Sequence, residues 1–139
     1  MSDGPLNRQQ IQERLLDSPF NAFLALEVVT ADPTKAEVVM RLKMRPQFER
    51  LAGTGIWHGG PIAAAIDIVG DYCLAMLFGK PVPTTNLRVD YLKPGKQTLT
   101  LVAHIRRSGK TLAVVDVDVL SETGDLVAIG RANYSTATA

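Results

Sequence analysis

The residues of this sequence best suited to chemistry are a His-Gly-Gly-Pro run at 58–61 and the carboxylate of Asp67 that follows it. Two glycines let the backbone turn tightly and let a ligand approach main-chain N–H groups, and Pro61 suits the first position of a helix. Residues 62–78 are apolar and helix-compatible except for Asp67 and Asp71. A helix start presents unpaired amides and the positive end of the helix dipole. The run therefore predicts an oxyanion site followed by the carboxylate that a hydrolysis needs.

The surroundings of Asp67 fit such a role. At helical spacing its neighbours are Ala63, Ala64 and Gly70, which are small enough to let a ligand or a second chain approach the carboxylate. Partial desolvation of Asp67 and the like charge of Asp71, one turn further along the helix, disfavour ionisation of Asp67 and make it a better base. The alternative is a structural aspartate that caps a neighbouring segment or pairs with an arginine.

Composition indicates the setting of this site. The 139 residues fit one domain over 1–139, and 46% hydrophobic with 21% charged residues is ordinary for a soluble globular protein. A net charge of +1 gives no basic field for nucleic acid, and a single cysteine, Cys73, forms no intrachain disulfide and no cysteine metal site. The polar first twelve residues lack the apolar core of a secretion signal, and two aspartates interrupt the longest apolar run. We expect a cytoplasmic protein that binds neither nucleic acid nor membrane.

Hydrophobic periodicity predicts the elements that position the site. In chain order they are a short helix over 7–16, strands over 23–29 and 36–44, a loop over 45–57, a long helix from 61 to about 78, and strands over 84–91, 99–105, 113–119 and 126–135. Asn7 would cap the first helix, and Ser18-Pro19 would end it. A long helix this apolar is best buried inside an antiparallel sheet that curls around it. The expected class is α+β, with a long central helix wrapped by a curved antiparallel sheet of about six strands.

The element order, with His-Gly-Gly at the helix start and an aspartate nine residues after the histidine, resembles the hotdog-fold acyl-CoA thioesterases of the phenylacetate-degradation (PaaI-like) type. The resemblance covers about residues 36–134 and includes Tyr91-Leu92-Lys93-Pro94 and the hairpin at 109–113. It implies a hotdog fold and hydrolysis of a small aromatic or medium-chain acyl-CoA, with no metal or other cofactor. It also implies a homodimer, often paired into a homotetramer, whose sites lie at the dimer interface and are built from both chains.

The same resemblance implies roles for individual residues. Asp67 would act as nucleophile or as general base on a water, and the amide of Gly59 would polarise the thioester carbonyl. His58 would shape the loop and help to position the substrate, and Thr84 would assist the attacking water. At the sixth position before the histidine, many relatives have Asn or Gln, whereas this sequence has Ala52, which removes a possible contact to the substrate carbonyl or to water.

Further substrate-binding candidates flank this motif and follow the fourth strand. Gly60 and Trp57 are next to the histidine, although Trp57 could equally be a core residue. Coenzyme A brings phosphates, so basic groups are expected near the entrance to its site. Arg106, Arg107 and Lys110, around the Ser108-Gly109 turn, are the candidates for these groups, and the alternative is a solvated basic turn.

Two other functions fit parts of the sequence. A hotdog acyl-CoA dehydratase or hydratase would need a histidine base deep in the site, whereas the predicted helix has the carboxylate of Asp67 there. A non-catalytic acyl-CoA-binding protein is the alternative raised by Ala52. Release of free thiol from a panel of acyl-CoAs distinguishes hydrolysis from binding alone.

Overall fold

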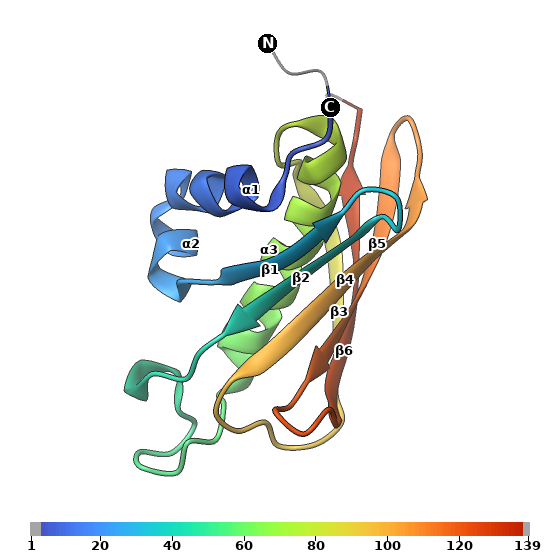
Figure 1. Ribbon diagram of the computed structural model, residues 1–139. Helices are drawn as coiled ribbons and strands as arrows, with labels where there is room; N and C mark the ends of the chain where they lie inside the picture. Colours follow the sequence, from blue (N-terminus) through green and yellow to red (C-terminus); the bar gives the residue numbers. More distant parts are fainter. Residues whose placement is uncertain (1–3, 138–139) are drawn as a thin grey trace.

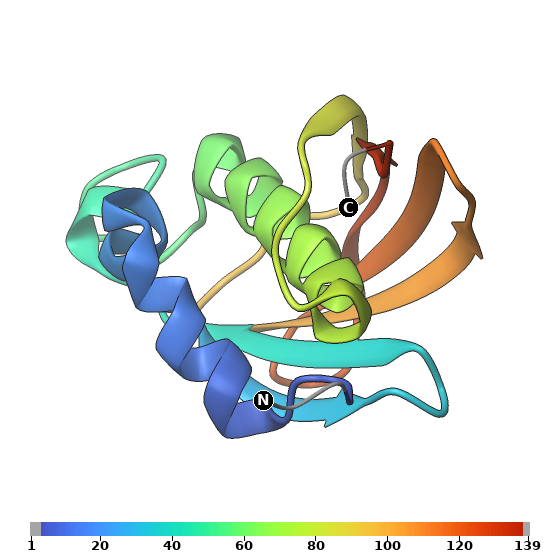
Figure 2. The same ribbon diagram turned by 90° about the horizontal axis from the view of Figure 1, so that it is seen from above.

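A six-stranded antiparallel sheet curves around one long helix in the computed structural model, which describes residues 4–137 (Figures 1 and 2). The elements are α1 (Arg8–Arg14), η1 (Leu15–Asp17), α2 (Pro19–Leu24), β1 (Glu27–Asp32), β2 (Glu37–Leu42), η2 (Pro46–Phe48), α3 (Gly59–Phe78), β3 (Thr84–Tyr91), β4 (Leu99–Ser108), β5 (Leu112–Leu120) and β6 (Leu126–Ser135). The strand order is β1-β2-β4-β5-β6-β3, and every pair of neighbours is antiparallel. The predicted fold class is confirmed.

Burial of α3 holds the layers together. A stripe of apolar residues at helical spacing is buried and comprises Ile62, Ile66, Val69, Cys73 and Met76. The inner face of the sheet supplies the opposing side chains, among them Val38, Met40, Leu101, Val115, Val117 and Ala132. By length and composition α3 could cross a membrane, but 61% of its most apolar window is buried inside the fold. Packing against the sheet accounts for its apolar composition.

The N-terminal segment differs from the sequence prediction. Ser18-Pro19 does not only end a helix but also begins another, because the Ser18 hydroxyl accepts a hydrogen bond from Asn21 N–H (3.3 Å) and Pro19 takes the first helical position. Phe23 is therefore helical, and β1 begins only at Glu27. Two short helices and a 3₁₀ turn therefore span residues 8–24, where one short helix over 7–16 and the start of a strand at 23 were expected.

The edge of the sheet at β1 is covered by α1. Asn7 caps this helix as predicted. The Gln12 side chain accepts a hydrogen bond from Val28 N–H (2.7 Å) and donates one to the Leu26 carbonyl (2.9 Å), and Arg8 donates to the Val28 carbonyl (3.3 Å). Side chains of α1 thus occupy hydrogen-bonding groups that an edge strand would otherwise expose.

The opposite edge, at β3, is bare. This eight-residue strand contains no proline and pairs only with β6. Within residues 4–137, no other segment hydrogen-bonds to its outer side. A long unprotected edge is a template for pairing with another chain.

A tyrosine of β6 contacts α3 at its middle. The Tyr134 hydroxyl donates to the Asp67 carbonyl (2.8 Å), and a Cβ on Gly70 would overlap that hydroxyl. The small residue at position 70 therefore accommodates Tyr134 of the same chain. The expectation that it makes room for a ligand or a second chain is wrong.

An aspartate ties the segment between α3 and β3 to the helix. Asp71 Oδ1 accepts a hydrogen bond from Val82 N–H (2.8 Å). Burial raises the pKa of Asp71 from 3.8 to about 7; the hydrogen bond from Val82 opposes this rise, and the charge of Asp67 adds to it. The folded protein therefore holds this proton more tightly than the unfolded chain does.

The first prediction concerns Gly70→Ala. We expect it to lower the free energy of unfolding by about 1–3 kcal/mol, because overlap with the Tyr134 hydroxyl outweighs the gain of about 1 kcal/mol that alanine has over glycine in a helix. Denaturant titration measures the loss. In a Tyr134→Phe background, where the hydroxyl is gone, the same alanine should cost less. Equal costs in the two backgrounds would contradict the explanation.

The second prediction concerns pH. Ionisation of Asp71 opposes folding, and this penalty is absent well below pH 3.8, grows as the pH rises towards 7 and is constant above that. It amounts to at most about 4 kcal/mol. Asp71→Asn keeps an acceptor for Val82 N–H without the charge, so its free energy of unfolding should rise relative to the parent between about pH 4 and pH 8. If the free energies of unfolding of Asp71→Asn and the parent differ by the same amount throughout this pH range, ionisation of Asp71 does not oppose folding.

Candidate active site

The start of α3 is built around His58. His58 is the N-cap, its Nδ1 accepts a hydrogen bond from Gly60 N–H (3.1 Å), and its own N–H donates to the Phe48 carbonyl (2.8 Å). The helix begins at Gly59, so Pro61 is its third residue and not its first, and the two glycines are helical instead of forming a turn. Proline is tolerated there because amides of the first turn have no intrahelical acceptor.

One amide remains available at this helix start. The N–H groups of His58 and Gly60 are occupied, and Pro61 has none. Gly59 N–H has no acceptor among residues 4–137. The positive end of the helix dipole acts at the same place. This amide can therefore donate to an anion or an oxyanion.

Tyr91, at the end of β3, explains the glycine at position 59. A Cβ on Gly59 would lie 3.1–3.3 Å from the Tyr91 side chain, and the Tyr91 hydroxyl donates to the Gly59 carbonyl (2.7 Å). The sequence motif indicated neither contact. Burial raises the pKa of Tyr91, so its hydroxyl keeps its proton and remains a donor to this carbonyl.

A groove of about 490 Å³ lies beside Gly59, and Trp57, Ile62 and Tyr91 contribute to its walls. Trp57 is buried as well, because its indole stacks on Phe48 (5.4 Å between ring centroids) and donates to the Gln97 carbonyl (2.7 Å). It is therefore both a core residue and a wall of the groove.

Two cations, Arg50 and Lys93, also line this groove. Sequence analysis did not select them as substrate ligands. Lys93 lies within the Tyr-Leu-Lys-Pro motif that had been noted only as a family signature. Arg50 lies in a loop without periodicity, and nothing local to it indicated its position.

Asp67 and Thr84 lie together, as predicted. The Thr84 hydroxyl donates to Asp67 Oδ1 (2.6 Å). Asp67 is half-buried, and within residues 4–137 its Oδ2 has no protein partner and no basic side chain pairs with it. A structural salt bridge therefore does not explain this aspartate.

The spacing between Gly59 and Asp67 limits what one chain can do. The two residues are eight positions apart on a continuous helix, which separates them by about 12 Å along its axis. A reacting carbonyl must lie within about 3 Å of both the oxyanion donor and the attacking group. The Gly59 amide and the Asp67 carboxylate of one chain therefore lie too far apart to contact the same carbonyl directly.

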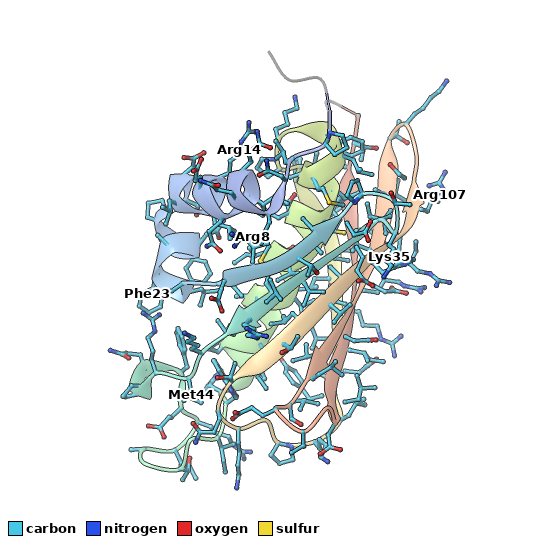
Figure 3. All side chains as sticks on the ribbon, viewed as in Figure 1. Arg8, Arg14, Phe23, Lys35, Met44 and Arg107 are labelled. Carbon is cyan, nitrogen blue, oxygen red and sulfur yellow. The ribbon has the colours of Figure 1, made fainter. Side chains whose placement is uncertain are left out.

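The basic hairpin of Arg106, Arg107 and Lys110 lies at the opposite end of the molecule from the start of α3. Figure 3 shows Arg107 at the β4–β5 turn, whereas Met44, which precedes the loop to α3, lies at the opposite end. Arg106 pairs with Asp116 (3.5 Å) on the face of the sheet turned away from α3, and Lys110 is exposed. The role of these cations as phosphate ligands stays a prediction.

Comparisons with known proteins agree with the motifs and the fold. The family model of the thioesterase superfamily matches residues 54–128, more than half of the chain. Mouse acyl-coenzyme A thioesterase 13 is 30% identical over 137 residues, which cover 94% of this chain and 95% of the relative. The medium/long-chain acyl-CoA thioesterase YigI of Escherichia coli K12 is 28% identical over 132 residues, 84% of each chain.

A solved structure agrees as well. The PaaI protein from the phenylacetic acid degradation operon of E. coli superposes with a TM-score of 0.78 at 22% identity, over 91% of this chain and 90% of that one. This likeness shows the hotdog fold. The predictions of the fold, of a PaaI-like acyl-CoA thioesterase and of a thioester-hydrolysing enzyme are confirmed. The chain belongs to the thioesterase superfamily.

Proposed function

We propose that this protein hydrolyses acyl-CoA thioesters at a site formed by Asp67 of one chain and Gly59 of a second copy. Acyl-CoA as the substrate class is supported by the relatives named acyl-CoA thioesterases. The observation that carries the residue assignment is the pair of free groups, the Gly59 amide at the start of α3 and Asp67 Oδ2 beside Thr84.

The chemistry needs only groups of the protein and water. Attack on the thioester carbonyl forms a tetrahedral oxyanion, which the Gly59 amide and the dipole of α3 stabilise. Asp67 takes the proton of the attacking water, or attacks directly to give an acyl intermediate that water then hydrolyses. The Thr84 hydroxyl holds Oδ1, which leaves Oδ2 for the reaction. The thiolate of coenzyme A leaves and takes up a proton.

The second copy would dock at the bare edge of β3. Antiparallel pairing of two β3 strands around a two-fold axis extends the sheet across both chains. Thr84 begins β3 and contacts Asp67, so this interface brings the carboxylate of each chain next to its partner. A homodimer of this kind resolves the separation of about 12 Å between Gly59 and Asp67. Two such dimers would form the expected homotetramer.

The groove beside Gly59 supports the choice of acyl group. Its volume of about 490 Å³ and the apolar walls at Trp57 and Ile62 suit a small aromatic or medium-chain acyl group. His58 lines the groove and holds the Gly60 amide, so both residues would help to position the substrate.

Two sets of cations are candidates for the phosphates of coenzyme A. One is the predicted hairpin set of Arg106, Arg107 and Lys110. The other is Arg50 with Lys93, which line the groove. Substitution of each set, with KM as the readout, separates them.

The dehydratase alternative is disfavoured by the positions of the two histidines. Nδ1 of His58 is occupied by Gly60 N–H, and His104 is exposed on β4, paired with Asp116 on the outer face of the sheet. Within one chain neither lies beside Asp67. The His58 that a second copy would bring there accepts at Nδ1, so in its neutral form it carries its ring proton on Nε2 and has no free nitrogen to act as a base. The binding-only alternative rests on Ala52, which is exposed in the loop before Trp57.

The third prediction tests hydrolysis and Asp67 together. The parent should release free thiol from members of a panel of aromatic and medium-chain acyl-CoAs. Asp67→Asn should lower kcat by about a hundredfold or more while the variant keeps its fold and its oligomeric state, because the amide can still accept the Thr84 hydrogen bond. Saturable binding without thiol release by the parent would indicate a binding protein. Full turnover by Asp67→Asn would give this residue a structural role.

The fourth prediction tests the shared site by mixing two inactive variants. Gly59→Pro removes the amide donor at a helix position that tolerates proline, and His58 already has the extended backbone that precedes proline. Because a Cβ at position 59 would crowd Tyr91, the same chain also carries Tyr91→Ala, and the intact site of a mixed dimer takes both Gly59 and Tyr91 from the Asp67→Asn chain. After unfolding and refolding with Asp67→Asn at equal concentration, half of the dimers are mixed and each has one intact site. We expect recovery of about one quarter of the parent activity. Mixed dimers without activity would contradict a site built from two chains.

A further inference from the structure

Asp71 joins two parts of the chain that meet at the candidate site. It lies one helical turn after Asp67 on α3, and its Oδ1 accepts a hydrogen bond from Val82 N–H (2.8 Å). Val82 is only 4% exposed, in the segment that connects α3 to β3. The contact therefore fixes the end of this connection against the helix.

The constraint extends directly to Thr84. Pro83 lies between Val82 and Thr84, has a fixed φ, and accepts a hydrogen bond at its carbonyl from Ser135 N–H (2.8 Å). Two consecutive residues before Thr84 are thus held, one by α3 and one by the end of β6. The Thr84 hydroxyl then meets Asp67 Oδ1 at 2.6 Å.

Stability does not account for a carboxylic acid at this position. Burial raises the pKa of Asp71, so the acid opposes folding at neutral pH, where an uncharged side chain would not. Within residues 4–137, the titratable groups that face it are Asp67 and Tyr72 on α3 and Tyr134 on β6. None of them is a cation that would compensate its charge.

We propose that Asp71 is a positioning residue that holds the Val82 amide so that the Thr84 hydroxyl is presented to Asp67. This role rests on the proposed function of Asp67. Asp71 touches neither the thioester nor the water, and it acts through Thr84. Its contribution is to keep Oδ1 of Asp67 engaged, so that Oδ2 faces the reacting atoms.

Variants at position 71 separate the hydrogen bond from the charge. Asp71→Asn keeps an oxygen that accepts from Val82 N–H, so its kcat should stay within about threefold of the parent. Asp71→Ala removes the acceptor and should lower kcat by about tenfold with little change in KM, and we expect the same of Thr84→Ala. Asp71→Ser, whose side chain is too short to reach Val82, is the second variant if the alanine variant does not fold.

The decisive measurement is the double variant. If Asp71 acts through Thr84, then Asp71→Ala should have almost no further effect on kcat in a Thr84→Ala background. Losses that multiply, or an Asp71→Ala variant with parental kcat, would overturn the positioning role while Asp67→Asn remained inactive. Full turnover by Asp67→Asn would overturn the proposed function and this role with it.

Discussion

Burial of the apolar surface of α3 is the interaction on which the other features depend. The sheet curves because it must cover a 20-residue helix, and its six strands take their register from the side chains that face that helix. The same rigid helix sets the separation of the two groups proposed to react with the substrate. It fixes Gly59 at its start and Asp67 two turns further on, so the distance between amide and carboxylate cannot adapt to a substrate within one chain.

Periodic segments were predictable, and segments defined by single contacts were not. The alternation over 36–44 and in the last four strands, and the apolar run before Gly79, depend on many residues, so one exception does not change the conclusion. The boundary near residue 18 depends on two residues only. Serine and proline are signals both for the end of one helix and for the start of the next. The apolar Phe23 that follows was therefore assigned to a strand although it is helical.

The candidate site shows the same division. Asp67, Gly59, His58 and Thr84 were selected as candidates from residue type, spacing and family resemblance. Which amide stays free at the start of α3 could not be predicted, because the answer depends on Phe48 and on the side chain of His58. Contacts made across the sheet are equally invisible in the sequence. Tyr91 and Tyr134 reach α3 only because of the pairing of β3 with β6.

The unequal edges of the sheet have a consequence for assembly. A sheet with two open edges can recruit chains one after another into an endless ribbon. Here Arg8 and Gln12 occupy the outward backbone groups of Val28 in β1, whereas in the part of the chain that the structure describes no segment pairs with the outer side of β3. Pairing through β3 would use the outer backbone groups of that strand in both partners at once. Because α1 hinders pairing at β1, a sheet extended through β3 would close at two chains instead of growing into a fibre.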